Sequence, residues 1–150
     1  MNETYVDTGL FVKCYVEESN SKEVDALLRD LGTPFAFSHF HEIEIPNAIR
    51  LKRFRGEIAH GQESAALQAF RVDVDSGRLA RPVYDLGAVF IRAERLSGKH
   101  SGDLGTRSLD LLHVAVALEA GCKALASFDE RQRDCAALAG LKVIPAQVCK

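Results

Sequence analysis

The sequence predicts an α/β fold built on a mostly parallel, doubly wound sheet. Short apolar runs alternate along the chain with longer segments whose apolar residues recur at helical spacing. This alternation is typical of strand–helix–strand units, in which neighbouring strands run parallel. The 150 residues contain no internal repeat and no interdomain linker, so a single domain over residues 1–150 is expected.

The predicted strands are short and mostly apolar. In chain order they are Thr4–Asp7, Pro34–Phe37, Leu79–Val83, Lys123–Ser127 and Lys142–Ile144. Thr8 and Gly9, which follow the first strand, are expected to turn the backbone. The glycine-rich segment Gly98–Gly105 is predicted to be a polar loop.

Helices are predicted in most of the segments between these strands. They cover Leu10–Tyr15 as a short turn, Lys22–Leu31, the residues from Ser38 to about Phe54, Gln62–Gly77, Asp85–Ser97, Thr106–Glu119 and Glu130–Ala139. Ser38 is the expected N-cap of its helix, and Pro46 is expected to kink it. Gly32 and Gly121 are expected to end theirs.

The composition is that of an ordinary soluble protein, with 47% apolar and 27% charged residues. No apolar run approaches the length of a membrane span, and the first residues lack the pattern of a secretory signal, so a cytoplasmic location is expected. Cys14, Cys122, Cys135 and Cys149 show no CxxC spacing and are expected to stay reduced in that compartment.

The net charge of −2 and the pI of about 6.2 argue mildly against a nucleic-acid-binding protein. Basic residues are nevertheless grouped, at Arg50–Arg55 and again at Arg92–His100. Such groups can guide a phosphate backbone although the whole chain is acidic. They are equally typical of solvated helix faces.

Four acidic residues follow predicted strands or lie early in helices: Asp7, Glu44, Asp110 and Asp129. The carboxyl ends of the strands form the ligand crevice of an open parallel sheet, so these side chains are expected to converge there. Converging carboxylates repel one another unless a cation lies among them. A hard divalent cation with oxygen ligands, Mg²⁺ or Mn²⁺, suits that position. The sequence therefore indicates a metal-dependent phosphodiesterase.

Three of these acids also have a purely structural interpretation. Asp7 suits a turn, Asp129 suits a helix N-cap, and Asp110 near a helix start is favoured by the helix dipole. Against the last interpretation, Asp110 lies between apolar residues, where a charge needs a partner. Arg107, three residues earlier, is expected to steady that carboxylate or to contact a phosphate.

Neighbouring residues compete for places in the site. Glu42 lies two residues before Glu44, so on a helix the two point about 200° apart and only one faces the crevice. Glu44 is preferred because the apolar residues after it mark its side as buried. Asp103 is the alternative to Asp110. His113, one turn after Asp110, is either a further ligand or a hydrogen-bonded core histidine.

The segments around the four acids resemble the acidic motifs of PIN-domain nucleases. They are Tyr5-Val6-Asp7-Thr8, Glu44-Ile45-Pro46-Asn47-Ala48-Ile49, Arg107-Ser108-Leu109-Asp110-Leu111-Leu112-His113-Val114-Ala115 and Ser127-Phe128-Asp129, in the family's order. The nearest subgroup is the VapC-like toxins of toxin–antitoxin pairs, and the resemblance runs from Tyr5 to about Val143. Two departures are Pro46, where a helix former is more usual, and Ser127, where Thr is commoner.

The resemblance implies a three-layer α/β/α domain with endoribonuclease activity. It implies that Asp7, Glu44, Asp110 and Asp129 hold Mg²⁺ or Mn²⁺ and that water is the nucleophile. Thr8, Arg107 and Ser127 are the expected substrate contacts. The implied partners are an RNA substrate, a cognate antitoxin protein and a second copy of the chain in a homodimer.

Two other functions remain open from the sequence. One is a PIN-fold module that binds RNA or protein with weak catalysis. The other is a Mg²⁺-dependent phosphatase or phosphoacceptor domain on a doubly wound sheet. A phosphoacceptor normally needs a lysine at a strand end, and none lies near Asp129.

Overall fold

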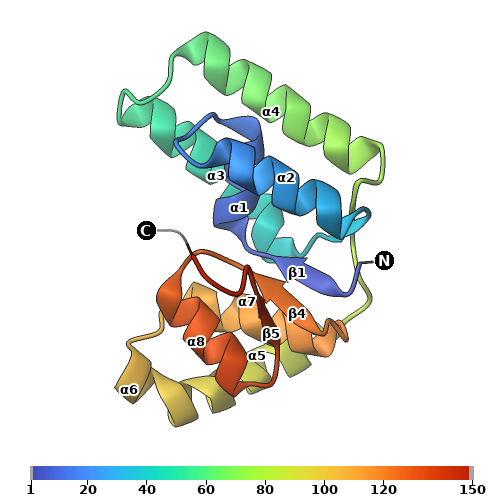
Figure 1. Ribbon diagram of the computed structural model, residues 1–150, viewed down its shortest axis with the longest axis vertical. Helices are drawn as coiled ribbons and strands as arrows, with labels where there is room; N and C mark the ends of the chain where they lie inside the picture. The colour runs from blue at the N-terminus through green and yellow to red at the C-terminus, as the bar shows by residue number, and fades with distance from the viewer. Residues whose placement is uncertain (1, 149–150) are drawn as a thin grey trace. The chain divides into compact units, whose positions relative to one another are not determined.

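The computed structural model describes residues 2–148, which group into two compact units. Unit 1 comprises Asn2 and Thr8–Arg81, and unit 2 comprises Glu3–Asp7 and residues 82–148. Each unit has a parallel sheet of its own, and each contains several of the helices drawn in Figure 1. That division was not apparent from the sequence, and the expectation of a single domain stays a prediction.

Unit 2 is built on a three-stranded parallel sheet. Its strands are β1 (Thr4–Val6), β4 (Ala124–Ala126) and β5 (Lys142–Ile144), in the order β1-β4-β5. Val6 pairs with Ala126, and Ala126 pairs with Ile144, so the three strands end in register. Residues of β1 and β4 are almost fully buried, as expected of strands covered on both faces. All three were predicted.

The helices of unit 2 are α5 (Leu86–Leu96), α7 (Ser108–Glu119) and α8 (Glu130–Leu138), with the shorter η1 and α6 between α5 and α7. Helix α5 packs on α7, α7 contacts β4, and α8 contacts β5. Asp85 caps α5 by accepting a hydrogen bond from the backbone of Ala88 at 2.6 Å. Gly121, with φ of 74°, follows the end of α7 as predicted.

The predicted loop Gly98–Gly105 is wrong for most of its length. The backbone continues from α5 into a π-helical turn, η1 (Ser97–Ser101), and a short helix, α6 (Gly102–Leu104). Glycine lowers helix stability but does not forbid helix where a preceding helix supplies the nucleus. The helical run ends at Gly105, whose φ of 66° lies in the left-handed region.

Unit 1 is mainly helical. Its helices are α1 (Thr8–Tyr15), α2 (Ser21–Leu31), α3 (His39–Phe54) and α4 (His60–Asp75). Strands β2 (Phe35–Ala36) and β3 (Leu79–Ala80) pair in parallel. Helix α3 packs against α1 and α4, and aromatic rings fill the space among these elements. The expected turn at Thr8 and Gly9 is wrong, because both residues begin α1.

The start of α3 follows its sequence signal. The Ser38 hydroxyl accepts a hydrogen bond from the backbone of His41, and the His41 ring accepts one from the backbone of Ser38. This reciprocal pair satisfies two backbone donors at the helix start, like a capping box. Pro46 lies inside α3, and the predicted kink there stays a prediction.

The predicted α/β class with a parallel sheet is confirmed. Cys14, Cys122 and Cys135 are free thiols, as expected, and Cys149 lies outside the described residues. Between residues 2 and 148, no helix is long and apolar enough to cross a membrane.

Candidate functional site

Three predicted acids of unit 2 lie where strands end or helices begin. Asp7 follows β1, and its backbone N–H continues the sheet by donating to Ala126 at 2.9 Å. Asp129 follows β4 and is the N-cap of α8. Because β1 and β4 are adjacent and parallel, their carboxyl ends meet at one edge of the sheet. Asp110 lies in the first turn of α7.

Arg107 joins two of these acids. Its Nε donates to Oδ2 of Asp110 at 2.9 Å, and its Nη2 donates to Oδ2 of Asp129 at 3.3 Å. Hydrogen bonding to Asp110 comes first among the causes that raise the pKa of Arg107, followed by the charge of Asp110 and then those of Asp129 and Asp7. The expectation that Arg107 steadies Asp110 is confirmed.

The side chain of Asp110 is only 11% exposed. Besides the guanidinium, it accepts a hydrogen bond from the backbone N–H of Arg107 at 3.3 Å. It therefore has the charge partner that a buried carboxylate requires. The helix-start interpretation holds, because the carboxylate accepts from the backbone at the start of α7. That Asp110 binds a metal ion stays a prediction.

Gln132 joins Asp7 to Asp129, and the sequence reasoning missed it. Its side-chain Nε2 donates to Oδ1 of Asp7 at 3.2 Å, while its backbone N–H donates to Oδ1 of Asp129 at 2.9 Å. The side chain is fully buried, and its Oε1 has no hydrogen-bond partner. The sequence offered no signal for this role, because the contact with Asp7 depends on the folded structure.

Ser127 supports Asp129. Its Oγ accepts a hydrogen bond from the backbone N–H of Asp129 at 3.1 Å, and the residue is fully buried. The structure thus gives Ser127 a positioning role. Direct contact between Ser127 and substrate stays a prediction.

The fourth acid, Glu44, belongs to unit 1. The hydroxyl of Thr8, which directly follows Asp7 in the chain, donates to Oε2 of Glu44 at 3.1 Å. Glu44 is half-buried on α3, whereas Glu42 is exposed and pairs with Arg81 at 2.5 Å. Glu44 is thus the less exposed of the two acids, as expected, and its preference over Glu42 as a site residue stays a prediction. That Glu44 joins the three aspartates, and that Thr8 meets substrate, stay predictions.

The other candidates occupy different positions. His113 is buried, and its Nδ1 lies 2.7 Å from the hydroxyl of Tyr5, which matches the core interpretation. Asp103 is exposed on α6. Of the basic residues, Lys52 and Arg53 of α3 pair with glutamates, as does Arg92 of α5. Their charges are therefore partly balanced within the chain.

The donor chemistry of unit 2 fits a hard divalent cation. Asp7, Asp110 and Asp129 offer carboxylate oxygens, the ligands that Mg²⁺ and Mn²⁺ prefer. Asp110 and Asp129 already share one cation, the guanidinium of Arg107. With these side chains as they stand, no three His, Cys, Asp or Glu residues among the described ones are close enough to hold a metal ion.

A comparison with protein-family models identifies the fold. The PIN domain model matches residues 4–138, which includes all four acids. The chain belongs to the PIN-domain family. Proteins of this family are typically nucleases and generally depend on divalent metals. A comparison with individual curated proteins found no match.

Proposed function

We propose that this PIN-domain protein is a Mg²⁺- or Mn²⁺-dependent endoribonuclease and the toxin of a toxin–antitoxin pair. The main support is the linked set of Asp7, Asp110 and Asp129 in unit 2, with Arg107 and Gln132 between them. Acids supplied by one sheet edge and two helix starts are suited to hold a hard cation. Glu44 is proposed as a further ligand.

A bound divalent cation supplies water of lowered pKa and neutralises charge on the phosphate that reacts. The chain's own residues hold the carboxylates in place. The backbone N–H of Arg107 fixes Asp110, and Gln132 fixes both Asp7 and Asp129. Such support from neighbouring hydrogen bonds keeps ligands in a productive arrangement. Cleavage by water leaves a 5′-phosphate and a 3′-hydroxyl.

The test is cleavage of single-stranded RNA by the purified protein with Mn²⁺, with Mg²⁺ and with a chelator. We expect cleavage that depends on the metal. Asp7→Asn should lower the cleavage rate more than about a hundredfold, because one ligand charge is lost. This fold-change corresponds to a loss of at least ~2.7 kcal/mol of barrier stabilisation. Asp103→Asn, which removes an exposed acid of the same unit, is the control and should cleave normally.

Residual activity of Asp7→Asn within about tenfold of wild type would exclude Asp7 as a central ligand. Hydrolysis of a small phosphomonoester without RNA cleavage would favour the phosphatase. RNA binding without turnover in either metal would favour the binding module.

The toxin role requires a partner that blocks the acids. The proposed antitoxin inserts an arginine or lysine from a flexible tail, since Asp110 and Asp129 accept a guanidinium within this chain. A homodimer and a cytoplasmic location are also part of the proposal. Expression of the chain alone should slow growth, co-expression of its genomic neighbour should restore it, and Asp7→Asn should be harmless. Equal growth with wild type and Asp7→Asn at matched soluble expression would exclude the toxin.

A further inference from the structure

Arg107 is the cation that links Asp110 and Asp129 in unit 2. Its fork contacts both oxygens of Asp110, with Nε at 2.9 Å from Oδ2 and Nη2 at 3.4 Å from Oδ1. The same Nη2 lies 3.3 Å from Oδ2 of Asp129. A planar guanidinium that holds one carboxylate with two donors and reaches a second does what a shared metal ion would do.

The guanidinium is the exposed partner of this cluster. The side chain of Arg107 is 66% exposed, whereas those of Asp110 and Asp129 are 11% and 35% exposed. An exposed guanidinium regains water when it leaves a carboxylate, so its release costs little. The more buried carboxylates have no such compensation.

Each of the two acids has a backbone donor besides the guanidinium. Asp110 retains the backbone N–H of Arg107, and Asp129 retains the backbone N–H of Gln132. The donor N–H groups belong to the N-cap residue of α7 and to the first turn of α8, where the helix starts fix the backbone. Departure of the arginine therefore exposes a preformed pair of carboxylates.

We propose that the Arg107 guanidinium is an exchangeable counter-cation, which stabilises the metal-free acids and must leave Asp110 and Asp129 when a divalent cation binds. This inference rests on the proposed function, in which these acids are metal ligands. Arg107 is on this account a positioning residue that lowers metal affinity. In the metal-free protein the acids pair with Arg107, and in the metal-loaded protein they bind the divalent cation instead.

Calorimetric titration with Mn²⁺ tests the exchange. Arg107→Gln should bind Mn²⁺ about three- to tenfold more tightly than wild type, because the ion no longer displaces two exposed ion pairs. Arg107→Lys, which keeps the charge but loses the fork, should gain less. Arg131→Gln removes an exposed arginine of α8 in the same unit and should change affinity less than about twofold, since its charge is screened.

Thermal unfolding gives a second readout that a purely structural ion pair would not produce. Arg107→Gln should melt about 2–4 °C below wild type without metal, and saturating Mn²⁺ should remove that deficit. The same deficit in melting temperature with and without Mn²⁺ would overturn the exchange. Unchanged or weaker Mn²⁺ binding by Arg107→Gln, or an equal gain in affinity in Arg131→Gln, would also overturn it.

The titrations separate this inference from the proposed function. Absence of Mn²⁺ binding in every variant would overturn the proposed metal centre as well. Equal Mn²⁺ binding by wild type and Arg107→Gln would overturn the role of Arg107 alone.

Discussion

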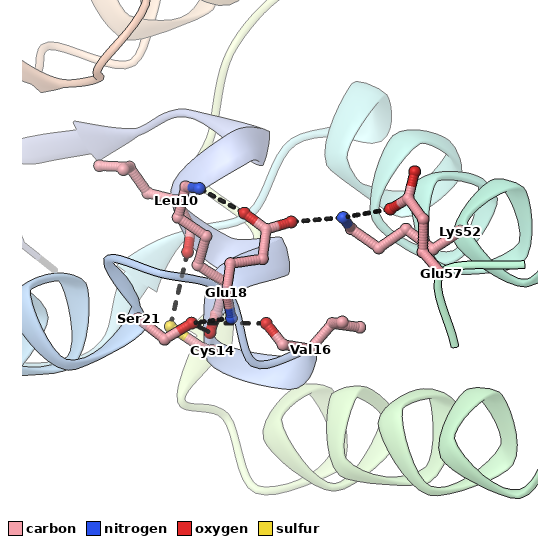
Figure 2. A network of polar contacts seen from close by, with 8 residues as sticks. Leu10, Cys14, Val16, Glu18, Ser21, Lys52 and Glu57 are labelled. Carbon is pink, nitrogen blue, oxygen red and sulfur yellow. Dashed lines mark hydrogen bonds and ion pairs between the residues drawn. The ribbon is translucent and has the colours of Figure 1, made fainter. Parts of the chain in front are cut away.

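Units 1 and 2 each contain a network of ion pairs, and the two networks differ in charge balance. In unit 1, Glu18 lies between Lys13 and Lys52, and Lys52 also contacts Glu57 at 3.0 Å (Figure 2). Two cations thus meet two anions, and the exposed Arg55 lies 4.0 Å from Glu57 at the edge of the network. In unit 2, the described ion pairs join Arg107 to both Asp110 and Asp129, and Asp7 is linked to Asp129 through Gln132. In these ion pairs, two acids share one base.

The balanced network is complete in itself. Burial alone would raise the pKa of Glu18, but the hydrogen bonds and charges of Lys13 and Lys52 lower it below its ordinary value. The network joins α1 and α3 through the segment that holds Glu18, as Figure 2 shows for Glu18, Lys52 and Glu57. Its chemistry calls for no ligand. The unbalanced network instead retains net negative charge, which a further cation would neutralise.

Gln132 offers the largest test of this difference. Gln132→Met keeps the volume of the side chain and removes the hydrogen bond to Asp7. We expect Mn²⁺ affinity and RNA cleavage to fall about tenfold, the usual cost of losing a group that orients a metal ligand. The free energy of unfolding of the metal-free protein should change by less than about 1 kcal/mol, because the loss of that bond is offset by removal of the buried, unpartnered Oε1.

The measurements are calorimetric Mn²⁺ titration, cleavage rates and urea unfolding of the same variant. A large loss of stability with unchanged Mn²⁺ affinity would make Gln132 a packing residue. The unbalanced network would then have a structural role, like the network of unit 1.

The sequence indicated most elements of the fold because their signals are local. Apolar runs located β1, β4 and β5, and Ser38 located the start of α3. The two separate sheets were missed, because pairing between strands depends on contacts distant in the chain. The helical turns after α5 were missed because the glycines in this segment favoured a loop, whereas the preceding helix in fact continues into it.

The candidate site was predictable in its charged residues. Asp7, Asp110 and Asp129 were recognisable from their places after strands and at helix starts, and Arg107 from its spacing to Asp110. The role of Gln132 was not, because a neutral amide on a helix gives no periodic or charge signal. Its function depends on the distance to Asp7, 125 residues away in the chain, which only the folded structure provides.

A smaller effect is expected at the centre of the balanced network. Glu18→Gln should lower the free energy of unfolding by about 1–2 kcal/mol at neutral pH, because both lysines lose their shared anion. Mn²⁺ affinity and RNA cleavage should stay unchanged. Since the folded-state pKa of Glu18 lies below its ordinary value of 4.5, this stability is fully present above that pH and is lost as the pH falls through the folded-state pKa.

Urea unfolding of wild type and Glu18→Gln at neutral pH and at about pH 3 measures this loss. A difference in stability that stays the same at the lower pH would assign it to packing of the Glu18 side chain rather than to its charge.

The smallest effect belongs to the rim of the same network. Glu57 is 44% exposed, and Lys52 keeps its contact with Glu18 when Glu57 is changed. Glu57→Gln should therefore cost less than about 0.5 kcal/mol, and molar salt should remove even that difference. Urea unfolding at low and high salt measures it. A loss of stability equal to that of Glu18→Gln would mean that all the charges of the network are coupled, and that Glu18 is not its centre. The charge balance of unit 1 would then depend on all its members, as that of unit 2 is proposed to depend on Arg107.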